Sequence, residues 1–188
     1  SSSFPKVLGP KKMRCMIPCA VDQDPYFRMT RDVASRLNEH KPALICSKFI
    51  PALVGLNTKM SASSTNTCIY VTDTPNQIKN KVSVSDCSDA KINRHAYSGG
   101  RDTEEEQRKY GADLSKDIPY QYLEYFLDDD VELKRIHDDY EAGRMLTGEV
   151  KKILIGEVQK LIHDFQVRRA AVTEEEVDEF FSIRQLEF

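Results

Sequence analysis

The chain has 188 residues, 40% of them hydrophobic and 30% charged, which allows one soluble globular domain or two small ones and provides no apolar run near the roughly 20 residues of a membrane-spanning helix. The formal net charge is −3, but residues 1–63 contain ten Lys or Arg and four Asp or Glu, whereas the remaining residues contain 17 and 26. A basic first third suits a ligand that carries phosphate. An acidic remainder excludes a protein that binds nucleic acid non-specifically over its whole surface.

The first expected elements form a strand, a helix and a second strand. The apolar run over residues 15–21 predicts a buried strand of a parallel sheet, although Pro18 argues against a central position. Asp24 followed by Pro25 predicts the N-cap of a helix that ends near residues 41–42, and residues 43–47 predict the second strand. This order is the crossover unit of an open α/β sheet, in which ligands bind outside the carboxyl ends of the strands.

Asp22 and Gln23 follow the first strand at that end of the sheet. Asp22 either closes the turn before the helix or accepts a hydrogen bond from a ribose hydroxyl or an ammonium group. Gln23 offers both a donor and an acceptor to a small ligand. Taken alone, the Asp22-Gln23 pair favours the interpretation that Asp22 only closes the turn.

A turn-rich segment after the second strand contains Lys59-Met60-Ser61-Ala62-Ser63. The ammonium group of Lys59 and the backbone N–H groups beside short side chains are suited to holding phosphates. Such a short motif also occurs in ordinary surface loops. Because both loops are expected at the same edge of one sheet, they support each other as a nucleotide site.

Residues after 70 have the periodicity of an all-helical bundle. The expected helices begin near Asp73, Glu104, Asp117, Val131, Thr147 and Thr173, and Gly143 closes the fourth of them. Their apolar residues are expected in the core, including Val131, Phe126, Leu127, Phe165, Phe180 and Phe181. Charged pairs such as Lys151 with Lys152 and Arg168 with Arg169 are expected on exposed faces.

Three further groups each allow two interpretations. Asp128, Asp129 and Asp130 resemble a metal cluster, but consecutive helical residues point in different directions, so a solvated helix start is favoured. Arg101 and Asp102 follow two glycines, so a flexible loop that contacts a base edge or a phosphate is as plausible as a local ion pair. The five cysteines, Cys15, Cys19, Cys46, Cys68 and Cys87, include no C-x-x-C pair, which favours reduced thiols over zinc.

Five segments of the sequence closely resemble the eukaryotic-type tryptophanyl-tRNA synthetases, which are class I aminoacyl-tRNA synthetases. They are residues 17–34, 49–53, 59–63, 98–103 and 145–149, in the same order as in the family. The resemblance implies the carboxyl-terminal half of such an enzyme. Residues 1–68 would be the last part of a Rossmann-type, doubly wound catalytic domain, and residues 69–188 a helical-bundle domain that binds the anticodon.

The resemblance also implies roles for individual residues. Lys59 would stabilise the pyrophosphate leaving group, and the loop from Met60 through Ser61 and Ala62 to Ser63 would close over ATP, with Mg²⁺ carried by the nucleotide. Asp22 and Gln23 match the family's Asp-Gln pair, which holds the ribose and the amino group of L-tryptophan. Arg101 and Asp102 match a loop that meets the anticodon of tRNA(Trp). Family members are cytoplasmic homodimers.

The sequence departs from the wider class I pattern in several places. Ala62 stands where the general motif has a second lysine, and Ala20 replaces a glycine; the eukaryotic branch shares both changes. The chain is longer than expected around residues 84–93, before the presumed anticodon loop. No histidine begins a His-x-Gly-His segment, which contacts ATP in the family, so the 188 residues alone are expected not to form tryptophanyl-adenylate.

Other functions stay open at this point. The first alternative is a related class I synthetase for tyrosine, which has the same fold. Most of the pocket for the amino-acid side chain lies upstream in the family, so these residues do not distinguish the two substrates. A non-catalytic module that binds tRNA or protein is the alternative of a different class, and a helical interaction domain with an incidental loop is the third.

Overall fold

A computed structural model gives the structure of residues 14–47, 49–55, 60, 67–83 and 96–183. The chain divides into two compact units. One comprises Ser1–Phe49 and Val172–Phe188, and the other comprises Ile50–Ala171.

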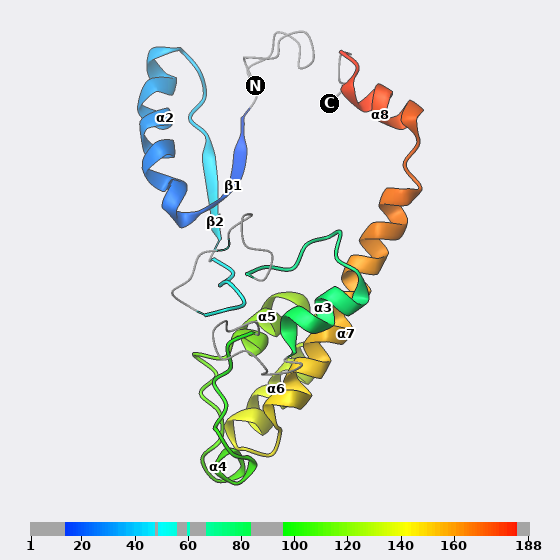
Figure 1. The fold of residues 1–188 in the computed structure, drawn as a ribbon. Helices are drawn as coiled ribbons and strands as arrows, with labels where there is room; N and C mark the ends of the chain where they lie inside the picture. The colour runs from blue at the N-terminus through cyan, green and yellow to red at the C-terminus, as the bar shows by residue number, and fades with distance from the viewer. Residues whose placement is uncertain (1–13, 48, 56–59, 61–66, 84–95, 184–188) are drawn as a thin grey trace. The chain divides into compact units, whose positions relative to one another are not determined.

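The first unit contains the predicted strand–helix–strand arrangement. Strand β1 (Met16–Ala20) leads through a single 3₁₀ turn, η1 (Val21–Gln23), into helix α2 (Asp24–Arg36), and strand β2 (Ala43–Ser47) follows (Figure 1). The two strands pair in parallel, from Met16 beside Ala43 to Ala20 beside Ser47. Both predicted strands and the helix between them are therefore confirmed, and Pro18 lies within β1.

The prediction that the first strand is buried was wrong. Met16 in β1 is 67% exposed and Ile45 in β2 is 51% exposed. Alternate residues of a strand point to opposite faces. Ile17, Cys19 and Ala20 in β1 and Leu44 in β2 are half-buried, and no residue of either strand is fully buried. Within the described residues, one helix covers one face of this two-stranded sheet and leaves the other open.

Both predicted ends of α2 need correction. The helix continues directly from η1, so Gln23 precedes its first residue and Asp24 lies inside it. The Asp24 carboxylate accepts a hydrogen bond from Arg28 Nε at 2.6 Å instead of capping the helix. The helix ends at Arg36, because Asn38 adopts a left-handed conformation with φ of 55° that an α-helix cannot contain.

The second unit is helical, as the periodicity predicted. It contains α3 (Pro75–Val82), α4 (Glu104–Tyr110), α5 (Ile118–Phe126), α6 (Asp130–Glu141) and α7 (Thr147–Ala170). Helices α3, α5 and α6 each pack against α7 (Figure 1). The last helix, α8 (Glu174–Phe181), follows Ala171 and belongs to the residues of the first unit.

The core of the helical unit forms around one stripe of α7. Val150, Leu154, Val158 and Ile162 recur at intervals of four residues and are buried. They pack in one cluster with buried residues of the other helices, which include Ile78, Val82, Leu123, Ile136 and Tyr140. The spacing matches one face of a helix, so helical periodicity places these four residues correctly. Leu161, whose position in the same periodic pattern also predicts burial, is 47% exposed.

The segment before the helices also joins this core. Leu53 is fully buried, its N–H donates to the carbonyl of Thr67, and its carbonyl accepts from the N–H of Tyr97. Tyr122 donates its hydroxyl hydrogen to the Pro51 carbonyl at 2.8 Å. Residues 50–55 therefore pack with the helices, and the expected domain boundary between residues 68 and 69 stays a prediction.

Most predicted helix starts are confirmed, and one is displaced. The side chains of Asp117 and Thr173 cap α5 and α8, and Asp129 caps α6 on a solvated surface. Thr74, not Asp73, caps α3, through a reciprocal pair of hydrogen bonds with Gln77.

Asp73 has a different structural role from the predicted cap. It is 6% exposed and forms a salt bridge of 2.6 Å with the ammonium group of Lys81. It also accepts from the N–H of Tyr70 at 2.8 Å.

Several apolar residues expected in the core are exposed. Val131 is 81% exposed, Phe165 39%, Phe180 80% and Phe181 78%. Val131 lies in the first turn of α6, and the described residues provide no cover for the two rings of α8 beyond their edge-on contact with each other. Phe126 and Leu127 do pack against the core. Helical periodicity predicts which residues share one face of a helix. It does not predict how much of that face neighbouring helices cover.

Candidate functional site

Asp22 and Gln23 lie where the sequence placed them, directly after the carboxyl end of β1. Both belong to η1, in which no residue is buried. The residue before η1 is Ala20, and no side chain caps that turn. Gln23 makes no capping hydrogen bond to α2 either. Because the fold uses neither side chain for capping, the structure weakens the turn-closing interpretation of Asp22, and the ligand-binding role stays a prediction.

The predicted phosphate loop lies mostly outside the described residues. Lys59, Ser61, Ala62 and Ser63 are not described, whereas Met60 is described and is 44% exposed. The insertion near residues 84–93 lies outside the described residues too. The ATP-binding role of the loop stays a prediction.

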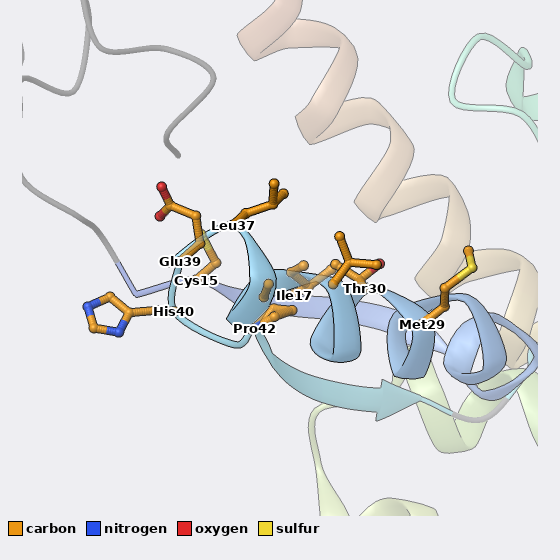
Figure 2. Close-up of a pocket in the computed structure, with 10 residues that line it drawn as sticks. Cys15, Ile17, Met29, Thr30, Leu37, Glu39, His40 and Pro42 are labelled. Atoms are coloured by element: carbon orange, nitrogen blue, oxygen red, sulfur yellow. The ribbon is translucent and has the colours of Figure 1, made fainter.

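The strand–helix–strand unit has a hollow of about 430 Å³ beside the first half of β1 (Figure 2). It is lined by Cys15, just before β1, by Ile17 of β1, by Met29 and Thr30 of α2, and by Pro42 (Figure 2). Cys15 and Pro42 precede the two strands, whereas Asp22 follows the opposite end of β1. The hollow is therefore not the predicted nucleotide site.

In the helical unit, a buried carboxylate organises the loop that contains Arg101. Asp117 has no exposed surface, and its Oδ2 accepts hydrogen bonds from Ser98 Oγ at 3.0 Å, Gly99 N at 2.9 Å and Tyr140 Oη at 2.8 Å. Its Oδ1 accepts from Tyr120 N at 2.8 Å, which is the N-cap bond of α5. Four donors thus satisfy one buried charge, as its burial requires.

The network extends to the start of α7. The hydroxyl oxygens of Tyr140 and Thr147 are 3.0 Å apart, and those of Ser98 and Thr147 are 3.3 Å apart. Burial, followed by the charge of Asp117, raises the pKa of Tyr140. Tyr140 therefore stays a neutral donor, and the Ser98 loop is tied to α5, α6 and α7.

The two glycines before Arg101 serve close packing, which corrects the expectation of a flexible loop. A Cβ on Gly99 would lie 1.9 Å from the carbonyl oxygen of Asp113, and a Cβ on Gly100 would lie 2.2 Å from Thr147 Oγ1. Real Cβ atoms do not approach other atoms so closely. Glycine is required at both positions because backbone and neighbouring elements come into contact there.

Arg101 projects from this anchored loop and is exposed. Its Nε donates to the Gly111 carbonyl at 3.0 Å, and its backbone N–H donates to Gln107 Oε1 at 2.9 Å. Among the described residues it forms no salt bridge, so the local ion pair with Asp102 is not what holds it. Asp102 is also exposed. Both side chains are therefore available to a ligand, and their contact with an anticodon stays a prediction.

A cavity of about 440 Å³ between α3 and the start of α7 contains three lysines. Its lining residues are Lys79, Ser83, Thr147, Gly148, Lys151, Lys152 and Ile155. Thr147 belongs to this cavity and to the network around Asp117, so the cavity adjoins the loop of Arg101. The first turn of α7 adds the positive end of its helix dipole.

Lys151 contradicts the expectation that Lys151 and Lys152 lie on an exposed face. It is only 9% exposed, and among the described residues its ammonium group has no hydrogen bond or ion pair. Burial lowers the pKa of Lys151, while the negative charge of Asp117 opposes that shift. The available signal was its position next to Val150 and three residues before Leu154, both of which belong to the apolar stripe.

Gln107 is the second residue that the sequence did not single out. It is 3% exposed, and its Nε2 has no hydrogen-bond partner among the residues that the structure describes. Its Oε1 accepts from the Arg101 N–H, which fixes the orientation of the amide. Gln107 therefore positions the Arg101 backbone, and no sequence motif indicated this contact.

The described residues contain neither a metal-ligand cluster nor a membrane-spanning helix. They include no group of three His, Cys, Asp or Glu side chains arranged to hold a metal ion. None of their helices is long and apolar enough to cross a bilayer.

Comparison with known proteins gives consistent matches over nearly the whole chain. The cytoplasmic tryptophan–tRNA ligase of Mus musculus is 54% identical over 189 aligned residues, which cover 100% of this chain and 37% of the mouse protein. The corresponding ligase of Dictyostelium discoideum is 54% identical over 178 residues, covering 95% of this chain and 42% of that protein. The chain thus spans about two fifths of the length of these relatives.

Solved structures agree with the sequence matches. The tryptophanyl-tRNA synthetase from Giardia lamblia superposes with a TM-score of 0.79 at 50% identity, covering 89% of this chain and 39% of that structure. The family model for class I tRNA synthetases, of the W and Y type, matches residues 11–181. Because that match covers most of the sequence, the chain belongs to the class I tRNA synthetases of the tryptophan and tyrosine group.

Proposed function

We propose that the protein containing this chain is a cytoplasmic tryptophan–tRNA ligase. It activates L-tryptophan with ATP and transfers it to tRNA(Trp). The observation that carries this proposal is the identity of 54% with cytoplasmic ligases of that name, over the whole of this chain in the mouse relative. Tyrosine is the second candidate substrate, because the matching family model covers both amino acids.

In the activation step, the tryptophan carboxylate attacks the α-phosphate of ATP and pyrophosphate leaves. No covalent enzyme intermediate forms, so the chain acts by positioning and by charge stabilisation. Lys59 places an ammonium group near the leaving phosphates, while the loop from Met60 through Ser61 and Ala62 to Ser63 contacts the nucleotide. Magnesium would accompany ATP, bound mainly through phosphate oxygens and water, and would neutralise phosphate charge.

Asp22 and Gln23 complete the part of the site that this chain supplies. Their exposed position at the carboxyl end of β1 suits a ligand outside the sheet. The Asp22 carboxylate accepts from the ribose or from the tryptophan ammonium group, and the Gln23 amide donates and accepts beside it.

The helical unit contacts the tRNA. Arg101 and Asp102 read the anticodon from a loop that the Asp117 network holds in place. The adjoining cavity of Lys79, Lys151 and Lys152 takes a backbone phosphate. The burial of Lys151 supports this, because burial lowers its pKa and an anion in the cavity would favour the charged form. The protein works as a homodimer.

Aminoacylation by the full-length protein tests the proposal. Cytoplasmic tRNA is incubated with the protein, ATP and labelled tryptophan or tyrosine, and acid-stable label on tRNA is counted. We expect charging with tryptophan only. Charging with tyrosine establishes the second candidate, and charging with neither, alongside tRNA binding that Arg101→Ala weakens, identifies a non-catalytic binding module.

A further inference from the structure

Two cysteines face each other across the carboxyl ends of β1 and β2. Cys19 and Cys46 are register partners in the parallel ladder, one residue before the last pair, Ala20 and Ser47. Register partners point to the same face of a sheet. The next pair on that face, Ile17 beside Leu44, is half-buried. Cys19 and Cys46 therefore lie side by side on the face toward α2.

The spacing of the strands brings their sulfur atoms within reach of each other. Neighbouring strands are about 4.7–4.9 Å apart, and disulfides join Cα atoms about 4.4–6.8 Å apart. The pair falls near the short end of that range. Because side chains of register partners run parallel instead of converging, an S–S bond here is strained, and strained disulfides are easily reduced.

The electrostatic surroundings show that the two thiols interact. Partial burial raises the pKa of Cys19, and the charge of Cys46 and a hydrogen bond to its thiol raise it further. The carboxylates of Asp24 and Asp22 act in the same direction. Cys19 is thus held as a thiol beside Cys46, and both are free cysteines.

Access to the pair is one-sided. Cys46 is exposed, whereas Cys19 is half-buried. The other described cysteine of this unit, Cys15, precedes β1 and lies outside the strand pairing. A reagent therefore meets Cys46 first, and Cys19 is the neighbour positioned to react second.

We propose that Cys19 and Cys46 form a dithiol modification site that closes to a reversible disulfide with a low-molecular-weight disulfide such as oxidised glutathione. The Cys46 thiolate attacks one sulfur of oxidised glutathione, an S–S bond breaks, and one glutathione thiolate leaves. The Cys19 thiolate then attacks the Cys46 sulfur and expels the second glutathione thiolate. Two protein thiols are oxidised, one glutathione disulfide is reduced, and the two protons released pass to the glutathione thiolates.

The bond would tie together the two chain segments that leave the sheet at this edge. Cys19 is three residues before Asp22, and Cys46 is one residue before the end of β2. The dithiol chemistry depends only on the register of the two strands, and it holds whichever amino acid the protein activates.

Phenylarsine oxide is the probe, because trivalent arsenic binds two adjacent thiols and releases one water. The purified protein is titrated with it, and bound arsenic and lost thiols are counted by intact mass and thiol assay. We expect one arsenical per chain and two lost thiols. Cys46→Ser and Cys19→Ser should each weaken binding about 100-fold or more, because chelation is lost. Cys15→Ser, Cys68→Ser and Cys87→Ser are the matched controls and should bind as before.

Peptide mapping after treatment with oxidised glutathione is the second measurement. A Cys19–Cys46 cross-link that a mild reductant removes supports the site. A glutathione adduct that stays on Cys46 without closing, or equal arsenical affinity in Cys46→Ser and the parent protein, overturns it.

Discussion

Replacing Asp117 tests the buried network that holds the Arg101 loop. Asp117→Ala removes the acceptor for Ser98 Oγ, Gly99 N, Tyr120 N and Tyr140 Oη, at distances between 2.8 and 3.0 Å. Each hydrogen bond to a charged group contributes about 1.5–3 kcal/mol, but bonds that share one acceptor do not add. Removing one member of a buried charged network costs about 3–5 kcal/mol, and we expect a loss of that size.

Urea unfolding, followed by circular dichroism, measures this change. With a slope of about 2 kcal/mol per molar urea, the transition midpoint should fall by about 2 M. Asp117→Asn should lose less, because its Oδ1 still accepts from Tyr120 N while its amide opposes the Gly99 N–H. Asp128→Ala, an exposed carboxylate in the same unit, is the matched control and should change stability by less than about 0.5 kcal/mol. A loss below about 1 kcal/mol for Asp117→Ala, comparable to the control, would refute the reasoning.

Four further predictions follow from the same geometry. Gly99→Ala should destabilise the chain by about 1–3 kcal/mol, whereas Gly156→Ala, where a Cβ meets nothing within 4 Å, should be neutral or stabilising; equal effects in urea unfolding would contradict the packing argument. Lys151→Met should weaken tRNA binding about tenfold and flatten the salt dependence by about 0.7 in log–log slope, with stability unchanged or slightly higher; an unaltered slope in filter binding would exclude the phosphate contact. Burial raises the pKa of Tyr122 and Tyr140, so above pH about 10 the folded state keeps protons that the unfolded state loses. The free energy of unfolding should therefore fall above that pH, by up to about 1.4 kcal/mol per pH unit for each tyrosine. The double variant Tyr122→Phe with Tyr140→Phe should show a flat pH profile of stability where the parent protein shows a falling one. The 188 residues alone should show no tryptophan-dependent ATP–pyrophosphate exchange, since they contain no His-x-Gly-His segment; measurable exchange would disprove this.

Local sequence signals predicted a helix start correctly where a single capping interaction determines it. Thr173 and Asp117 were identified as helix starts, because a capping side chain acts within three residues of its own position. The start of α3 was misplaced by one residue, since Asp73 and Thr74 are both good capping residues. Lys81, eight residues further on, pairs with Asp73, and no local rule includes that contact.

Burial was harder to predict than helix position. Val158 and Phe165 lie on the same predicted face of α7, yet Val158 is 3% exposed and Phe165 39%, because neighbouring helices cover only part of its length. Lys151 shows the opposite error. Its charge indicated an exposed face, whereas packing between α3 and α7 encloses it.

The candidate site also has features that the sequence predicted and features that it did not. Asp22 and Gln23 were placed at the end of a strand by the order of elements, which the structure confirms. The glycines before Arg101 were interpreted as flexible, although they are required by contacts with Asp113 and Thr147. Those contacts join residues distant in sequence, so only the structure identifies them.

Tryptophan-dependent ATP–pyrophosphate exchange by the full-length protein tests the central claim most directly, with Lys59→Ala as the paired variant. The proposed role of Lys59 predicts robust exchange with tryptophan in the parent protein. In the variant, the exchange rate should fall by about 100-fold or more, as for other groups that stabilise developing charge, while tryptophan binding changes little. Absence of exchange in the parent would contradict the ligase function, and equal losses of rate and of tryptophan affinity in Lys59→Ala would contradict the role given to Lys59.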